Sequence, residues 1–101
     1  MAYLLSKHYQ IRCRNFFGRF GELDIIATDP EGMLVFVEVK AYKTGSLVHP
    51  LEAISPKKIK RLKQTVRLYL AKTRYQGPCR FDVLVIQDGA VEHLENAILF
   101  D

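Results

Sequence analysis

The chain has 101 residues, enough for a single domain over residues 1–101 with one modest hydrophobic core. Hydrophobic residues make up 49% and the longest apolar run is only a few residues, which excludes a membrane-spanning helix. The net charge of +4 permits a polyanionic partner without requiring one. Two cysteines cannot form a disulfide framework and the start shows no secretory signal, so we expect a cytoplasmic protein with reduced thiols.

The first half of the chain predicts a three-stranded antiparallel meander. Residues 2–7 resemble the end of a helix too short to be stable alone, and residues 10–16 alternate in polarity as a strand does. Further strands are predicted over residues 22–28 and 34–40, with an Asp-Pro-Glu-Gly turn at 29–32 between them. Short turns between consecutive strands favour antiparallel neighbours.

The second half predicts one long helix and two more strands. Ser55 is a good N-cap, Pro56 suits the first helical position, and Gly77-Pro78 ends the helix. A strand over residues 80–86 should run parallel to the third strand, because a helical crossover joins them, and a short fifth strand follows at 91–94. The predicted fold is therefore α/β, a mixed sheet packed against a helix in the order (α)βββαββ.

Two neighbouring strands each place two charged side chains on one face. Side chains alternate along a strand, so Glu22 and Asp24 share a face of the second strand, and Glu38 and Lys40 share a face of the third. A hairpin register can bring Asp24 opposite Glu38. Burying these charges in such apolar strands is costly unless they are paired or bind a metal. Asp82, in contrast, is expected to make structural hydrogen bonds.

This pattern suits the metal-dependent hydrolysis of a phosphodiester. A divalent ion positions the phosphate and lowers the pKa of a bound water, and Mg²⁺ prefers a few carboxylates with other oxygen ligands. Asp24 and Glu38 would supply the carboxylates and the backbone carbonyl of Val39 a third oxygen, with Glu22 as an outer or second-metal ligand. Lys40 would stabilise the attacking hydroxide or the phosphorane.

The same residues also fit a solvated sheet face stabilised by cross-strand ion pairs. Leu34 and Phe36 lie on the face of the third strand that carries Glu38 and Lys40. That face is therefore apolar at one end and charged only at the other. The asymmetry favours a site on a covered face over a strip exposed to solvent.

The predicted helix is strongly basic. Between Ser55 and Arg74 there are eight Lys and Arg residues and no acidic one. Lys and Arg contacts to phosphates supply most of the sequence-independent affinity for DNA. An ordinary solvated helix face is the alternative. The candidate nucleic-acid-binding residues are Lys43, Lys57, Lys58, Arg61 and Gln64.

Several motifs together resemble the YraN-like family of small bacterial proteins. They are Gly-Glu-Leu-Asp at 21–24, Glu-Val-Lys at 38–40 and the segments 50–58 and 77–83, and the likeness covers nearly the whole chain. The family is assigned to the restriction-endonuclease-like, or PD-(D/E)xK, fold, and is similar to Holliday-junction resolvases and RecB-type nuclease domains. The resemblance implies a catalytic core of Asp24, Glu38 and Lys40, Mg²⁺ or Mn²⁺ as cofactor, and DNA as substrate, including branched recombination intermediates.

One departure from the family pattern concerns the first helix. Family members usually carry a longer helix with a Gly-x-x-Gly-Glu-type motif, whose acid corresponds to a resolvase carboxylate. Here the first helix is truncated, and Glu22 is the only acidic residue before Asp24. Three outcomes are compatible with this: a nuclease in which Glu22 substitutes, a catalytically silent DNA-binding module, or a protein-interaction domain whose uncovered apolar surface could form a homodimer.

Overall fold

The order of helices and strands is the predicted αβββαββ. The structure is a computed structural model that describes residues 2–42 and 54–99, so the expectations for Lys43 and for the rest of the connection at 43–53 lie outside the described residues. The elements are α1 (Ala2–Ser6), β1 (Gln10–Gly18), β2 (Gly21–Thr28), β3 (Leu34–Tyr42), α2 (Pro56–Thr73), β4 (Cys79–Gln87) and β5 (Ala90–Ile98).

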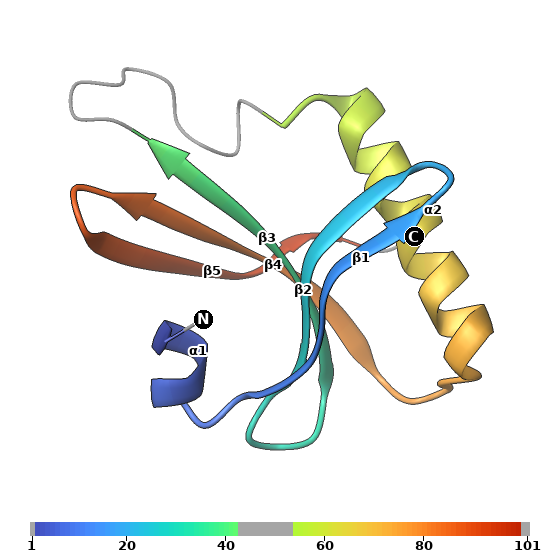
Figure 1. The fold of residues 1–101 in the computed structure, drawn as a ribbon, viewed down its shortest axis with the longest axis horizontal. Coiled ribbons are helices and arrows are strands. Elements are labelled where there is room, and N and C mark those ends of the chain that lie inside the picture. The colour runs from blue at the N-terminus through green and yellow to red at the C-terminus, as the bar shows by residue number, and fades with distance from the viewer. Residues whose placement is uncertain (1, 43–53, 100–101) are drawn as a thin grey trace.

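The strands form one mixed sheet in the order β1-β2-β3-β4-β5 (Figure 1). The meander β1–β2–β3 and the β4–β5 hairpin are antiparallel, whereas β3 and β4, which the α2 crossover joins, are parallel. The predicted meander and the predicted parallel pair are both confirmed. The two helices lie on different sides of the sheet, with the longer α2 beside the β1–β2 hairpin (Figure 1).

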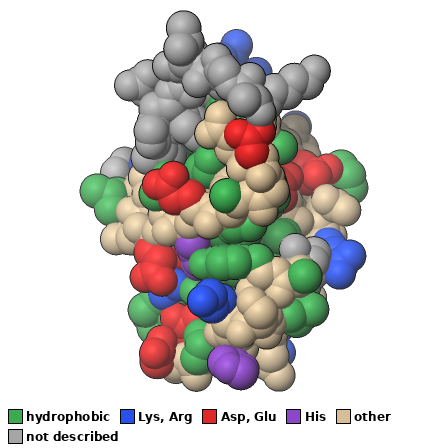
Figure 2. All heavy atoms as spheres, turned by 90° about the vertical axis from the view of Figure 1, so that its left-hand side faces the viewer, with side chains coloured by type: hydrophobic (Ala, Val, Ile, Leu, Met, Phe, Trp, Pro, Cys, Tyr) green, Lys and Arg blue, Asp and Glu red, His purple; other side chains and the backbone are tan. Residues whose placement is uncertain are grey.

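Charge is unevenly distributed over the two sides. Helix α2 carries seven Lys and Arg residues and no Asp or Glu. The side of the molecule remote from α2 shows acidic side chains among hydrophobic ones (Figure 2). A polyanion would therefore be attracted to the α2 side. Among the helices within residues 2–42 and 54–99, none combines the length and apolar character that crossing a membrane requires.

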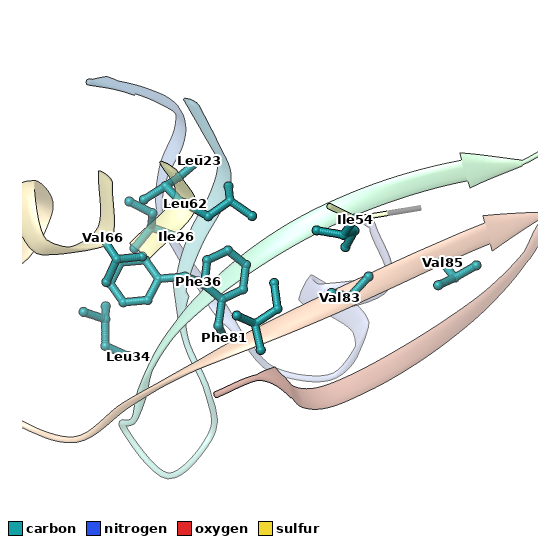
Figure 3. Close-up of a cluster of buried hydrophobic side chains, with 11 residues drawn as sticks. Leu23, Ile26, Leu34, Phe36, Ile54, Leu62, Val66, Phe81, Val83 and Val85 are labelled. Carbon is teal, nitrogen blue, oxygen red and sulfur yellow. The ribbon is translucent and has the colours of Figure 1, made fainter. Parts of the chain in front are cut away.

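The larger hydrophobic core lies between α2 and the sheet. Leu62 and Val66 of α2 point toward Leu23 and Ile26 of β2 and toward Phe36 of β3 (Figure 3). All five side chains are at most 3% exposed. This packing holds the strand segment that leads into Glu38 directly under the helix.

A smaller core lies on the other face of the sheet, under α1. Leu4 and Tyr9 pack there against Ile25, Val35 and Val37. Odd-numbered positions of β3 thus face α1, whereas Leu34 and Phe36 face α2. The predicted alternation of β3 is confirmed, and it places Glu38 and Lys40 on the α2 side.

Helix α2 begins as predicted but ends earlier. The Ser55 hydroxyl accepts a hydrogen bond from the Lys58 N–H at 3.1 Å, and Pro56 opens the helix. The helix ends at Thr73 because Arg74 adopts a left-handed conformation with φ of 57°, three residues before Gly77-Pro78. The predicted end of α2 at Gly77-Pro78 is therefore wrong.

All five strands are longer than expected, β5 most of all, and the side-chain pattern of β1 also differs. Strand β5 covers nine residues rather than 91–94, because it stays paired with β4 up to Ile98 beyond an irregularity in register. In β1 the expected alternation breaks at Asn15, which has a φ of 52° and is exposed. Phe16 instead turns toward α2, where its ring centroid lies 5.2 Å from that of Tyr69.

The β1–β2 hairpin is seated directly on α2 (Figure 1). A Cβ atom at Gly18 would lie 2.9 Å from the Leu68 Cδ2 and 3.4 Å from the Thr65 Cγ2. A larger residue would require the end of the Leu68 side chain to shift. The small size of glycine thus allows the hairpin to lie close against the helix.

Candidate active site at the divergence of two strands

Strands β2 and β3 separate at the predicted carboxylates. Their pairing runs from Thr28–Leu34 to Ile25–Val37 and goes no further, so Asp24 and Glu38 are the next residues on each strand. Beyond this point β2 remains paired with β1, and β3 remains paired with β4. The two strands visibly diverge there (Figure 1). The predicted opposition of Asp24 and Glu38 therefore occurs where the sheet opens.

Asp24 bridges the opening. Its Oδ2 accepts a hydrogen bond from the Val39 backbone N–H at 2.8 Å. This carboxylate takes the place of the strand partner that the Val39 N–H has lost, since a buried N–H left unpaired would cost free energy. The contact fixes Asp24 beside the chain segment that carries Glu38.

Glu38 is a buried carboxylate held by two ammonium groups. It is 3% exposed, and its Oε2 lies 2.8 Å from the Lys58 Nζ and 3.6 Å from the Lys40 Nζ. Burial, with a hydrogen bond to Asp24, raises the pKa of Glu38, and Lys58 opposes the increase. We call Asp24, Glu38, Lys40 and Lys58 the carboxylate site.

The two lysines of the carboxylate site differ. The hydrogen bond to Glu38 raises the pKa of Lys58, so Lys58 keeps its proton firmly. The neighbouring Lys58, together with burial, lowers the pKa of Lys40. Lys58 is therefore the fixed counter-ion of Glu38, and Lys40 is the lysine that loses its proton more readily.

The carboxylate site opens into a cavity of about 590 Å³ between the β1–β2 turn and α2. The cavity brings together nearly all the predicted site residues. From the two strands come Glu22, Asp24, Glu38, Val39 and Lys40, and from α2 come Lys57, Lys58 and Arg61. Gln64 does not line this cavity; it lines a neighbouring one that also contains Lys57 and Arg61.

The carboxylates are the groups of this site that could hold a magnesium or manganese ion. Asp24, Glu38 and Val39 line the same cavity. Mg²⁺ typically takes one or two carboxylates and completes its shell with water and substrate oxygens. Within residues 2–42 and 54–99, no three His, Cys, Asp or Glu residues are grouped closely enough to hold a metal. A metal here would thus rest on the carboxylate pair, with Glu22 farther out.

Comparison with known proteins gives the family. Residues 1–86 match the uncharacterised protein family UPF0102. The chain belongs to that family. A UPF0102 protein of Persephonella marina is 39% identical over 102 residues, covering 100% of this chain and 87% of the relative. One from Helicobacter pylori is also 39% identical, over 94% of this chain and 80% of the relative. The predicted YraN-like membership is confirmed.

Two solved structures are similar to this UPF0102 protein in fold. A repair endonuclease from Pyrococcus abyssi matches with a TM-score of 0.48 and 14% identity, over 87% of this chain and 34% of that chain. A complex of EndoMS with double-stranded DNA matches with a TM-score of 0.43 and 13% identity, over 74% of this chain and 26% of that chain. Family membership in UPF0102 rests on the sequence matches alone.

A second charged cluster lies on the α1 face of the sheet in this UPF0102 protein. Arg80 donates to Asp82 at 3.0 Å, to Asp29 at 2.8 Å and to the Tyr9 hydroxyl at 2.7 Å. His93 Nε2 lies 2.7 Å from the second oxygen of Asp82. We call these five residues the Arg80 network.

Only part of this network could be predicted from the sequence. The expectation that Asp82 makes structural hydrogen bonds is confirmed, because its Oδ1 also accepts from the Asn96 N–H at 2.8 Å. Arg80 and Asp82 are spaced two apart on β4, a signal that they share a face. Nothing in the spacing of Tyr9, Asp29 and His93 indicates that they meet there.

Proposed function

We propose that this UPF0102 protein is a metal-dependent phosphodiesterase that cleaves DNA. The observation that carries the proposal is the position of Glu38, a buried carboxylate on the wall of an open cavity, beside a second carboxylate and two ammonium groups. A purely structural ion pair needs no cavity, whereas hydrolysis needs room for a substrate.

The surroundings of the site support a polyanionic substrate. Lys57 and Arg61 of α2 are exposed and line the same cavity as Glu38. Their charges lie where the phosphates on either side of a scissile bond would pass. Phosphate contacts of this kind supply sequence-independent affinity for DNA.

The residues of the carboxylate site have different roles in this proposal. Asp24, Glu38 and the Val39 carbonyl would hold Mg²⁺ or Mn²⁺, which supplies positive charge to the phosphate and lowers the pKa of a water molecule. Lys58 keeps Glu38 ionised and oriented. Lys40 would donate hydrogen bonds to the attacking oxygen and to the charge that develops on the phosphorus oxygens.

A second function is favoured by one specific observation. The Lys58 Nζ already neutralises Glu38 at 2.8 Å, and the described residues contain no third acid grouped with the pair. A protein that retained the fold and lost metal binding would have these features. The alternative is therefore a DNA-binding module without catalytic activity.

A cleavage assay separates the two functions. We expect the wild-type protein to cleave DNA only with Mg²⁺ or Mn²⁺, and Glu38→Gln and Lys40→Gln each to lower the rate by about 100-fold or more. Single-stranded, duplex and four-way-junction DNA would be compared as substrates. Matched controls are Glu31→Gln and Lys72→Gln, which change exposed residues in a turn and in the last turn of α2.

The binding of the metal can be followed independently of turnover. Backbone NMR shifts of Asp24 and Glu38 should move on titration with Mg²⁺ in wild type and stay in place in Glu38→Gln. Equal cleavage by wild type and both site variants would contradict the assignment of the site. DNA binding with neither cleavage nor a metal-dependent shift would support the silent module.

A further inference from the structure

An aromatic ring is exposed in the turn between β1 and β2. Phe20 is 43% exposed, although a side chain of this size is usually buried in so small a protein. The guanidinium carbon of Arg19 lies 5.6 Å from the centroid of its ring, within the range of a cation–π contact. The turn thus presents a partly exposed aromatic ring with a positive charge over one of its faces.

Phe20 connects the carboxylate site to a second cavity. This second cavity, of about 740 Å³, lies between the same turn and α2 and is also lined by Arg19, Lys60 and Gln64. Phe20, Gly21, Lys57 and Arg61 line both cavities. The two cavities are therefore neighbours that share the wall at Phe20, one containing the carboxylates and the other a group of cations.

The ring is carried by a turn of fixed shape. Gly21, directly after Phe20, has a φ of +147°, a backbone conformation that side chains other than glycine rarely adopt. A Cβ atom at Gly18, on the other side of the turn, would meet Leu68 and Thr65 of α2 at 2.9 and 3.4 Å. The turn that carries Phe20 therefore lies close against the helix.

We propose that Phe20 is a stacking platform for an unpaired base of a DNA strand, whose phosphates lie along Lys57, Lys60 and Arg61. The proposal rests on the proposed function and narrows its substrate class to DNA that has unpaired bases beside the scissile bond. An aromatic ring inside a row of cations matches a nucleic-acid strand, which offers base faces and phosphates together. In a blunt duplex the base faces are stacked on one another, so they cannot reach the ring.

The test measures binding in EDTA, without any divalent ion, so that it does not depend on cleavage. The probes are a short single strand with 2-aminopurine at its centre, the blunt duplex of the same sequence, and a fork with unpaired arms. We expect wild type to bind the single strand and the fork more tightly than the duplex and to quench 2-aminopurine. Phe20→Ala should weaken binding to the single strand by about tenfold, the loss of one base–aromatic stack, and abolish the quenching.

Phe17→Ala is the matched control. Phe17 belongs to the same hairpin and is more exposed, at 72%, but it lines neither of the two cavities. This variant should keep both the affinity and the quenching. Equal weakening by Phe17→Ala and Phe20→Ala, or wild-type binding to the duplex as tight as to the single strand, would overturn the proposal.

The failure of this proposal is distinguishable from the failure of the proposed function. Glu38→Gln should still quench 2-aminopurine while losing cleavage. If wild type never cleaves DNA but Phe20→Ala still loses quenching, the platform stands and the phosphodiesterase does not. If cleavage depends on Glu38 but Phe20→Ala changes neither binding nor quenching, the phosphodiesterase stands and the platform does not.

Discussion

The carboxylate site and the Arg80 network are built from the same kinds of group and lie on opposite faces of one sheet. Each holds buried carboxylates with basic partners that come from several elements. In the Arg80 network, Arg80 is 15% exposed at its side chain, and Asp82 and Asp29 are 0% and 3% exposed. In the carboxylate site the two cations, Lys40 and Lys58, are 22% and 43% exposed.

The two clusters differ in exposure, because the cations of the carboxylate site reach solvent whereas Arg80 is largely enclosed. Arg80 has five N–H donors and uses them on fixed partners, and no buried polar side-chain atom in the described part of the chain lacks a hydrogen bond. The lysines are single ammonium groups on flexible stems at the edge of a cavity. Lys40, which lies 3.6 Å from Glu38, can therefore turn toward a phosphate, whereas Arg80 is tied to its partners.

Removing Arg80, the cation at the centre of the Arg80 network, should show the largest difference in stability between the two clusters. Arg80→Met leaves Asp82 and Asp29 buried without their counter-ion, and we expect the free energy of unfolding to fall by about 3–5 kcal/mol, measured by urea denaturation. Arg67→Met, at an exposed position of α2, is the control and should change stability by less than about 0.5 kcal/mol. Similar losses in both variants would show that the network is not a structural centre.

The effect of pH on stability through Asp29 of the Arg80 network is expected to be smaller than the effect of losing Arg80. Burial alone would raise the pKa of Asp29, but hydrogen bonds from the Met33 N–H and from Arg80, with the charge of Arg80, lower it below its ordinary value of 3.8. A lowered pKa stabilises the fold above the pKa of the unfolded chain, and this contribution is lost as the pH falls through the folded value.

Asp29→Asn should therefore destabilise the protein at neutral pH by about 1–3 kcal/mol, the range for hydrogen bonds to a charged group. The gap between wild type and variant should close as the pH falls below about 4, near the unfolded pKa of Asp. Urea unfolding curves of both proteins, recorded across this pH range, measure the difference in their free energies of unfolding. A gap that stays constant down to the lowest pH would mean that the ionised carboxylate is not the stabilising species.

The smallest effect on stability is expected at the carboxylate site itself. Lys58→Met removes an ion pair whose cation is 43% exposed, so the free energy of unfolding should change by less than about 1 kcal/mol. DNA cleavage, in contrast, should fall clearly, because Glu38 loses the cation that keeps it ionised. A large loss of stability in Lys58→Met would show that the carboxylate site is a second structural network, no different in this respect from the Arg80 network.

Most of the fold could be predicted from local patterns. The alternation of β3, the Ser55 cap and the crossover before β4 each have a signature within a few residues. Two of the failures came where a single residue adopts a left-handed conformation, at Asn15 and at Arg74, because neither is a glycine and neither marks the change in the sequence.

Three residues of the carboxylate site, Asp24, Glu38 and Lys40, could also be recognised from local patterns. Glu38 and Lys40 interrupt an apolar strand, and Asp24 stands out on the neighbouring strand. The contact between Asp24 and the Val39 N–H was not predictable, since it depends on two strands separating in space. The exposure of the Phe20 ring was not predictable either, because an aromatic residue in a turn has no pattern that shows which way its ring points.

The start of α2 carries an electrostatic penalty that other parts of the molecule relieve. The aligned peptide dipoles of a helix leave a partial positive charge at its N-terminus, where an acidic residue is favourable. The first turn of α2 has no acidic residue and instead contains Lys57 and Lys58. Glu38, from β3, supplies the missing negative charge through its contact with Lys58. A phosphate near Lys57 would add to the same compensation, so anion binding and the integrity of this helical turn are thermodynamically linked.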